Sequence, residues 1–455
     1  MLITLFLVDH SLFCQWQNTM CNYLNKVNFY APMWLKKYCL SCILFLLSFV
    51  SFSQNIDSLK LALKNAKHDT TRCAILNQLS EKASEGEWQG FNAQLKKLSE
   101  NNIQKGGPLK NMYLHHLATS LNNFGYQYNE EGKALQAIEY LTKSLAINEE
   151  IGDKSNLASN LVNLGQSYYK LGNLSKALEC NYRELKIKTE LGDRQGIAKS
   201  LSTLGFNYYK LGNVQKALEY YFKSLKIFES LGDKIGMADE LNNIGTFYKD
   251  QGNFTNALIY HLKSLSLKKD VGNKIGIGVS LNNIGAIYQD RNEDEKALEY
   301  FTQSLKISEE ASNIEQVLIE LNNIGTIYSS RADYKTAQVY FEKNLKISTE
   351  KGNKPMMAYS LLNLGDIMLK ENKLEEARNY EIKAFQIAKN IGFPALLKNA
   401  AERLKLVYKK QNKYKEAFEM YELEIKMRDS INNQETQKAA IKKQLQYTYE
   451  KKELE

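Results

Sequence analysis

A strict period of forty residues runs through most of this chain and limits the folds that it can adopt. The pentapeptide Leu-Asn-Asn-Ile-Gly begins at Leu241, at Leu281 and at Leu321. Counted from Leu121, eight consecutive segments of forty residues end at Ala440 without an insertion or a deletion. A self-similar period of this length indicates a stacked array, in which each repeat packs mainly on its neighbours.

Within each segment the apolar residues follow the spacing of two α-helices. In the segment 201–240, Leu201, Leu204 and Tyr208 share one helical face. Ala217 and Tyr221 lie on a second helix. Gly-Asp or Gly-Asn ends most segments, because glycine closes a helix in the left-handed conformation and Asp or Asn caps the next helix. The sequence therefore predicts an all-α fold, an α-solenoid of stacked helical hairpins.

Small residues recur at two positions of the array. The first helices carry Gly125, Gly165, Gly205, Gly245, Gly285, Gly325 and Gly365. The second helices carry Ala137, Ala177, Ala217, Ala257, Ala297, Ala337, Ala377 and Ala417. Two helices approach closely only where side chains are small, so we expect these glycines and alanines to be the contact points of each hairpin.

Residues 121–440 resemble the tetratricopeptide repeat. The family pattern of a large apolar residue, Gly-x-x-Tyr, then Ala and an aromatic residue appears at Leu321, Gly325, Tyr328, Ala337 and Phe341. The forty-residue length is similar to a long-repeat branch that includes kinesin light chain and Gram-positive peptide-sensing regulators. HEAT and armadillo repeats have comparable lengths but lack this pattern. The resemblance implies a right-handed superhelix whose first helices line the concave side.

The second asparagine of each pair forms a column along the first helices. Its members are Asn123, Asn163, Asn243, Asn283, Asn323 and Asn363. An amide both donates and accepts hydrogen bonds, so such a column suits the main chain of an extended peptide. In the tetratricopeptide family this position commonly contacts a bound peptide, and the resemblance therefore implies a peptide groove. The alternative is that the amides bond to the neighbouring repeat and set the pitch of the superhelix.

Aromatic and basic residues neighbour this column in the early and middle repeats. The candidate groove residues are Tyr169, Lys170, Tyr209, Lys210 and Lys249. An aromatic and cationic half-groove would suit a protein or peptide ligand with apolar and acidic side chains.

Outside the repeats, the chain divides into three further segments. Residues 1–53 form an N-terminal extension and a secretory signal, in which Lys36 and Lys37 precede an apolar stretch and cleavage is expected after Ser53. Met33 is the expected start of the protein, and an uncleaved membrane anchor is the alternative. Residues 54–120 are expected to be a helical cap with one degenerate repeat. Residues 441–455 belong to an exposed C-terminal helix beginning near residue 434, whose thin apolar stripe suits a coiled-coil dimer.

No catalytic or metal-binding pattern emerges from the sequence. His115 and His116 are adjacent, so on a helix they point about 100° apart and do not chelate together. We expect no enzymatic activity, no cofactor and no metal. The net charge of +9 is spread over mixed-sign surfaces, which does not favour nucleic acid as a partner.

Three functional interpretations follow from these observations. The first is a non-catalytic, exported, periplasmic scaffold that binds a protein or an extended peptide. The second is the sensor portion of a membrane signalling receptor, because the C-terminal helix resembles a juxtamembrane helix. Its output module and C-terminal span would then be missing. The third is a cytoplasmic peptide-responsive regulator, which applies only if the N-terminal signal is not functional.

Overall fold

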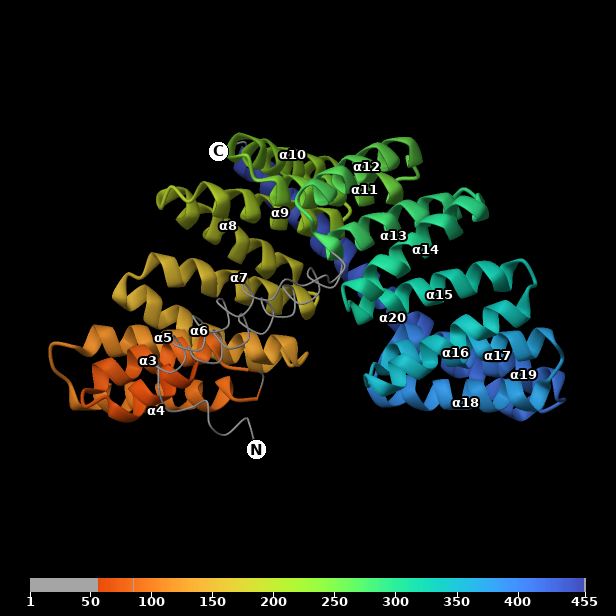
Figure 1. Ribbon diagram of the computed structural model, residues 1–455, viewed down its shortest axis with the longest axis horizontal. Coiled ribbons are helices and arrows are strands. Elements are labelled where there is room, and N and C mark those ends of the chain that lie inside the picture. Colours follow the sequence, from red (N-terminus) through yellow and green to blue (C-terminus); the bar gives the residue numbers. More distant parts are fainter. Residues whose placement is uncertain (1–55, 85, 454–455) are drawn as a thin grey trace, which may run out of the picture. The chain divides into compact units, whose positions relative to one another are not determined.

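The computed structural model describes residues 56–84 and 86–453, and every regular element in these ranges is a helix. The prediction of an all-α solenoid is therefore confirmed (Figure 1). The expected signal segment lies outside the described residues. The chain divides into two compact units, Met1–Ser120 and Leu121–Glu455.

The first unit contains a helix over residues 56–65, α3 (Asp69–Lys82) and α4 (Trp88–Lys105). Helix α5 (Lys110–Glu130) contains the boundary between the units. Cys73, Leu76 and Leu95 form the centre of a small apolar core. Two buried hydrogen bonds join α4 to α5. Asn92 Nδ2 donates to the Ser120 carbonyl at 3.0 Å, and Ser120 Oγ donates to the Asn92 carbonyl at 2.9 Å.

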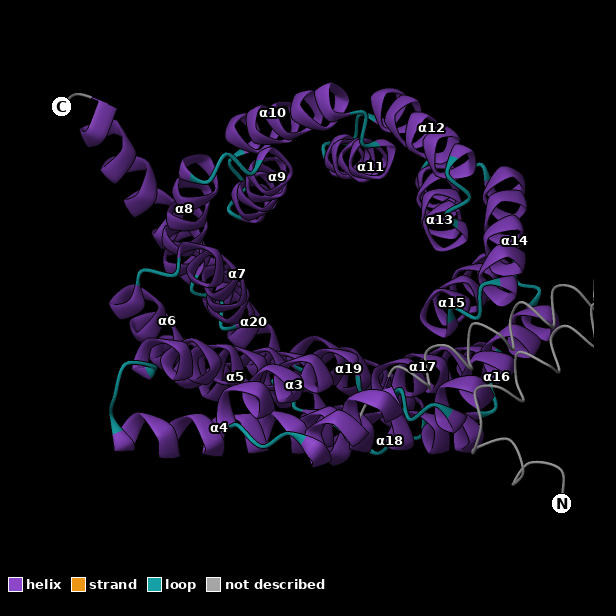
Figure 2. Cartoon of the chain, turned by 60° about the vertical axis from the view of Figure 1, so that its left-hand side comes forward, coloured by secondary structure: helices purple, strands orange, loops and turns teal. Residues whose placement is uncertain are grey.

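The second unit is a succession of antiparallel helix pairs. After α5 and α6 (Ala134–Ile151), the pairs are α7 (Lys154–Lys170) with α8 (Leu174–Glu190), α9 (Arg194–Lys210) with α10 (Val214–Leu231), α11 (Lys234–Asp250) with α12 (Phe254–Asp270), α13 (Lys274–Asp290) with α14 (Asp294–Glu310), α15 (Ile314–Ser330) with α16 (Tyr334–Glu350), α17 (Lys354–Lys370) with α18 (Leu374–Ile391), and α19 (Pro394–Lys410) with α20 (Tyr414–Glu453). Figure 2 shows α9, α11, α13 and α15 on the inner side of the curve, with α10, α12 and α14 outside them.

The turns between repeats have the chemistry that the sequence predicts. Gly192 closes α8 with a φ of +68°, where a side chain would be strained. The next residue, Asp193, caps α9, because its Oδ1 accepts a hydrogen bond from the Gly196 N–H at 2.8 Å. Asp233 does the same for Gly236 at 2.9 Å. These caps fix where each inner helix begins.

The glycine of each inner helix makes room for a bulky side chain sixteen residues later. A Cβ at Gly285 would lie 2.8 Å from Phe301 Cδ1, and a Cβ at Gly325 would lie 2.6 Å from Phe341 Cε1. We expected the alanine twelve residues later to be the partner. Ala297 is fully buried, but the nearest atoms to Gly285 belong to the phenylalanine. The glycine therefore receives a large side chain rather than a second small one.

In four hairpins a hydroxyl or amide group on the outer helix bonds to the inner helix. The donor is the twenty-fourth residue of a forty-residue segment, and the acceptor is a main-chain carbonyl of the inner helix of the same hairpin. These bonds are Ser224 Oγ to Ala198 O (2.8 Å), Ser264 Oγ to Ala238 O (2.7 Å), Ser304 Oγ to Gly278 O (2.8 Å) and Asn344 Nδ2 to Leu318 O (2.6 Å). All four donors are buried, so each bond satisfies a polar group that water does not reach.

Two carboxyl groups are buried where these clamps meet the next repeat. Glu320 is fully buried, and its Oε1 accepts from Ser304 Oγ and from Gln316 Nε2, each at 2.6 Å. Burial raises the pKa of the Glu320 carboxyl to about 7, although both hydrogen bonds oppose the shift. Burial also raises the pKa of Glu240 to about 7.

The last helix is longer than the second helix of any other repeat. Helix α20 (Tyr414–Glu453) is continuous through the predicted C-terminal helix and contacts α8. Within the described residues, no helix combines the length and the apolar character needed to cross a membrane.

The glycine contact makes a prediction about stability. Gly285→Ala should lower the free energy of unfolding by about 1–2 kcal/mol, because overpacking against Phe301 outweighs the helix propensity that alanine adds. The midpoint of urea unfolding, followed by circular dichroism, measures the loss. In a Phe301→Ala background the same glycine change should cost nothing, since the ring is gone. An equal loss in both backgrounds would contradict this assignment.

Glu320 makes a prediction about pH. Its folded-state pKa lies above the ordinary value of 4.5, so its contribution to stability is complete below pH 4.5 and is lost as the pH rises through 7. Between pH 5 and pH 8, wild type should lose about 2–3 kcal/mol more than Glu320→Gln. Urea unfolding of both proteins across this range measures the difference. Parallel pH profiles would show that Glu320 does not titrate in this window.

Candidate functional site

The asparagine pairs form a hydrogen-bonded ladder along the inner helices. In four places the second asparagine of one repeat donates from Nδ2 to Oδ1 of the first asparagine of the preceding repeat. These bonds are Asn163 to Asn122 (3.1 Å), Asn283 to Asn242 (3.0 Å), Asn323 to Asn282 (3.0 Å) and Asn363 to Asn322 (2.8 Å). The structural role that we kept as an alternative is therefore present.

This ladder uses only one side of the amide at Asn323 and Asn363. Each spends its Nδ2 donor on the neighbouring repeat, and its Oδ1 acceptor takes no part in the ladder bond. Asn283 differs, because its Oδ1 also accepts from Asn282 Nδ2 at 3.5 Å. Asn323 and Asn363 are half-buried, so part of each residue is exposed to solvent. A hydrogen bond on one side of an amide also fixes the direction of the other side. The ladder thus holds a row of oriented acceptors along the inner wall.

The ladder is interrupted around α9. Val162 and Ser202 stand where other repeats have the first asparagine, and Thr203 stands in the column itself. Thr203 Oγ1 donates to the Lys199 carbonyl of its own helix at 3.0 Å. At the C-terminal end, Arg403 takes the column position and donates to the Leu362 carbonyl at 2.8 Å.

A polar cleft opens at this interruption, between α9 and α11. It has a volume of about 450 Å³ and is lined by Gln195, Lys199, Ser202, Thr203, Phe228, Asp233, Ile235, Gly236, Asp239, Glu240 and Asn243. Asn243 therefore lines a cleft. The column amides that make ladder bonds, such as Asn283, lie instead against an asparagine of the preceding repeat.

The predicted aromatic and basic groove residues also join neighbouring repeats. Lys170 Nζ donates to the Asn129 carbonyl, and Lys249 Nζ lies 3.2 Å from Asp290 Oδ2. The Tyr209 hydroxyl donates to the Asp250 carboxylate. Each of these three contacts spans forty-one residues, as the asparagine bonds do. Lys170 Nζ also lies 3.9 Å from Glu130 Oε1, so two of the three lysines are partly neutralised within the protein.

The third lysine belongs to an aromatic cluster on α7 and α9. Tyr169 and Phe206 have ring centroids 5.3 Å apart. Lys210 Nζ lies 5.2 Å from the Phe206 ring and 4.9 Å from the Tyr209 ring, within the range of cation–π attraction. Phe206 is exposed and Tyr169 and Tyr209 are half-buried. This cluster presents apolar faces with one positive charge.

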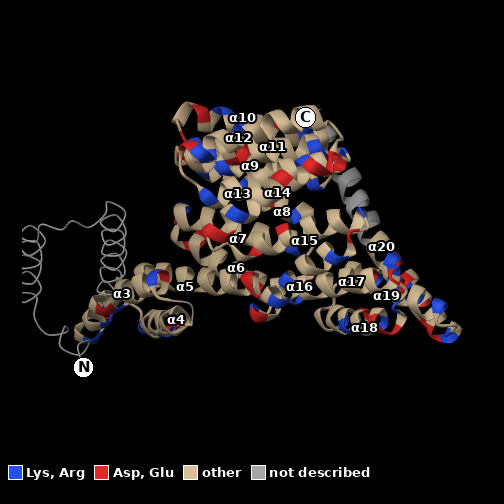
Figure 3. Ribbon diagram, turned by 45° about the vertical axis from the view of Figure 1, so that its right-hand side comes forward, with Lys and Arg blue, Asp and Glu red and all other residues tan. Residues whose placement is uncertain are grey.

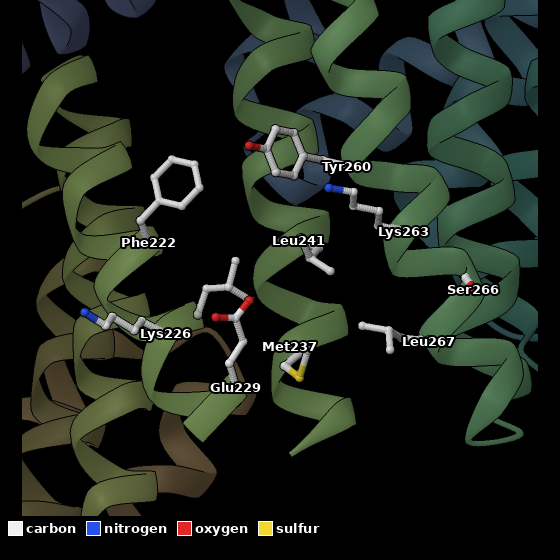
Figure 4. Close-up of a pocket in the computed structure, with 10 residues that line it drawn as sticks. Phe222, Lys226, Glu229, Met237, Leu241, Tyr260, Lys263, Ser266 and Leu267 are labelled. Carbon is white, nitrogen blue, oxygen red and sulfur yellow. The ribbon is translucent and has the colours of Figure 1, made fainter. Parts of the chain in front are cut away.

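A second, more apolar groove lies between α10 and α12, with α11 as its floor (Figure 4). Its volume is about 690 Å³. Phe222, Met237 and Leu267 supply apolar surface, and Lys226 and Lys263 lie at its edges. Because α10 and α12 are outer helices, this groove is not part of the asparagine column (Figure 2).

Charge and metal chemistry add no further site. Figure 3 shows both signs of charge interspersed along the helices of the second unit. In the described part of the chain, no three His, Cys, Asp or Glu residues gather in a way that would hold a metal ion.

Sequence reasoning missed the first asparagine of each pair and Glu240. Asn122, Asn242, Asn282 and Asn322 are the acceptors of the ladder. Their recurrence beside the column was visible in the sequence and could have suggested a pair that bridges repeats. Glu240 had a weaker signal, an acidic residue at a position where serine stands in three other repeats.

Comparisons with known proteins agree with this architecture. The Tetratricopeptide repeat family matches residues 116–190, 236–310 and 317–390. A search of curated proteins finds no significant match. Among solved structures, the apo form of RapI has a TM-score of 0.54 at 17% identity, covering 84% of this chain and 98% of RapI.

Two further solved structures have similar folds. A Rap protein complexed with competence and sporulation factor has a TM-score of 0.50 at 14% identity, covering 83% of this chain and 99% of that protein. The apo form of the quorum sensor NprR from B. thuringiensis has a TM-score of 0.50 at 17% identity, covering 74% of this chain and 93% of NprR. The helical hairpins within these three matched ranges are tetratricopeptide repeats.

Proposed function

We propose that this protein is a non-catalytic scaffold that binds an extended peptide or protein segment along its inner wall. The observation that carries the proposal is the oriented asparagine column, in which Asn323 and Asn363 keep an acceptor beside the ladder bond. An extended chain places main-chain N–H groups along its length, and a row of fixed acceptors matches them whatever the side chains are. The other candidate column members, Asn123 and Asn243, would extend this row.

The solved structures of similar fold support this class of ligand. One is a complex of a Rap protein with competence and sporulation factor, and another is described as a quorum sensor. At 14% and 17% identity this likeness concerns the fold alone. The proposed ligand class therefore rests on the asparagine column, and the likeness in fold is consistent with it.

The aromatic cluster refines the choice of ligand. Tyr169, Phe206 and Tyr209 offer apolar faces, and Lys210 stays beside them as a cation. Lys170 and Lys249 already contact acceptors of neighbouring repeats, so they contribute less free charge than the sequence suggests. In this part of the wall we expect an apolar side chain of the ligand, with an acidic residue next to it.

The column makes a prediction that separates binding from structure. A library of random linear peptides is selected on the wild-type protein, and the enriched peptides are measured by fluorescence anisotropy. The double variant Asn323→Ala/Asn363→Ala should weaken their binding about tenfold, because two contacts of the main chain are lost.

The matched control is Asn282→Ala/Asn322→Ala. It breaks the same two ladder bonds from the acceptor side but keeps both column amides. It should cost similar stability, about 1 kcal/mol per bond, and clearly less affinity. Equal losses of affinity in the two double variants would reduce the column to a structural role, and no enriched peptide at all would remove the proposal.

We also propose that the protein acts outside the cytoplasm. The support is the order of Lys36, Lys37, an apolar stretch and Ser53 in the sequence. Residues 33–53 fused to a reporter enzyme that is active only after export should give activity. Leu46→Arg/Leu47→Arg in the same fusion should abolish it, because charge in the apolar stretch blocks recognition. An inactive wild-type fusion would favour the cytoplasmic regulator.

A further inference from the structure

The cleft at the interruption of the ladder has an unusual balance of charge. Its lining includes three carboxyl groups, Asp233, Asp239 and Glu240, against one lysine, Lys199. Asn243 and Thr203 of the column also line it, so the cleft opens on the same inner wall as the proposed peptide groove. An extended ligand on the column would therefore pass over this cleft.

All three carboxyl groups have partners within the protein. Asp233 caps α11 through the Gly236 N–H, and its Oδ2 accepts from Gln195 Nε2 at 3.0 Å. Asp239 Oδ1 lies 3.6 Å from Lys268 Nζ. The hydroxyls of Ser202 and Ser224 bond to the Glu240 carboxyl. Glu240 still differs from the two aspartates, because it is only 2% exposed and its Oε2 has no hydrogen-bond partner among the described residues.

Glu320 shows that a buried glutamate at this repeat position does not by itself form a site. Glu320 and Glu240 stand at equivalent positions, eighty residues apart. The Oε2 of Glu320 also lacks a hydrogen-bond partner among the described residues, but Gln316 fills the space beside Glu320 and donates to its Oε1 at 2.6 Å. In the repeat of Glu240 the equivalent residue is Gly236. The Phe228 ring lies where its side chain would be, and the cleft opens beside these two residues. A glutamate at this position with a glycine four residues before it occurs in the array only at Gly236 and Glu240.

We propose that this cleft takes the cationic side chain of a lysine or arginine of the bound peptide, with Glu240 as its charge partner. The inference rests on the proposed function and adds a side-chain preference to it. An ammonium or guanidinium group donates several hydrogen bonds and carries the charge that a buried carboxylate needs as a partner. A volume of about 450 Å³ holds such a side chain, and Ser202, Thr203 and Asn243 supply acceptors around it.

This pairing makes the binding of basic peptides dependent on pH. Burial raises the pKa of Glu240 to about 7, with the hydroxyls of Ser202 and Ser224 opposing the shift. The other ionisable groups around it are Lys199, Asp233 and Asp239 at the cleft and Tyr221 on α10. A cation binds the ionised carboxylate, so affinity should rise as the pH rises from 6 to 8 and binding should release a proton.

The experiment is a selection with three variants. Random linear peptides with acetylated N-termini and amidated C-termini are selected on wild type, Glu240→Gln and Glu320→Gln at pH 8, and circular dichroism checks the fold of each protein. Wild type and Glu320→Gln should enrich lysine or arginine at one position of the peptide. Glu240→Gln should lose this enrichment and bind the wild-type peptides about tenfold more weakly.

Lys199→Ala provides a change of the opposite sign. Removing the only lysine of the cleft lining should strengthen the basic preference, and this readout does not depend on the folding of Glu240→Gln. Calorimetry in two buffers of different ionisation enthalpy should show proton release for wild type at pH 7. Glu240→Gln should not release that proton.

Each outcome has a definite meaning. Peptides enriched without a basic residue, or equal losses in Glu240→Gln and Glu320→Gln, would overturn the cation site and leave the peptide groove standing. No enrichment by wild type would overturn both. A basic preference that persists in Glu240→Gln would assign the charge partner to another residue and overturn the role of Glu240.

Discussion

The close contact between an inner-helix glycine and a bulky side chain sixteen residues later governs the shape of each hairpin. Gly285 receives Phe301 and Gly325 receives Phe341, and both rings are buried. Because the ring fills the space that a side chain at the glycine would occupy, the two helices approach closely without a void. Repeated at a fixed interval, this contact brings each inner helix to the same place in its hairpin. A residue at a given repeat position therefore meets its counterpart in the next repeat at a constant separation.

That regularity explains which features could be predicted from the sequence. The period, the helical hairpins and the Asp or Asn caps follow from local patterns, and the structure has them. The partner of the glycine could not be inferred, because Ala297 and Phe301 lie on nearly the same face of their helix. Whether Asn283 bonds to Asn242 or faces a ligand depends on the rotation between repeats, which no local pattern encodes. The cleft at Glu240 is harder still, since it arises from the coincidence of Gly236, Thr203 and a buried acid in one repeat.

The buried polar groups show a second use of the same regularity. Serines on the outer helices satisfy carbonyl groups of the inner helices and leave little room for variation in spacing. Glu240 and Glu320 enter this arrangement at a cost in desolvation, which raises their pKa values. At Glu320 a glutamine completes the hydrogen bonding on one oxygen. At Glu240 the hydroxyls of Ser202 and Ser224 bond to the carboxyl, and its Oε2 has no partner among the described residues. In the proposed cation site, a ligand would offset the remaining desolvation cost.

The continuous helix α20 ties the last repeat to an early one, since it lies against α8. In an open array of hairpins, each repeat contacts mainly its neighbours, so a small change at any interface between repeats changes the curvature of the array. Because α20 contacts α8, it couples these small changes: the diameter of the array can change only if α20 shifts along α8 or detaches from it. A ligand on the inner wall that stabilises a wider or a narrower curvature would then change the contact of α20 with α8.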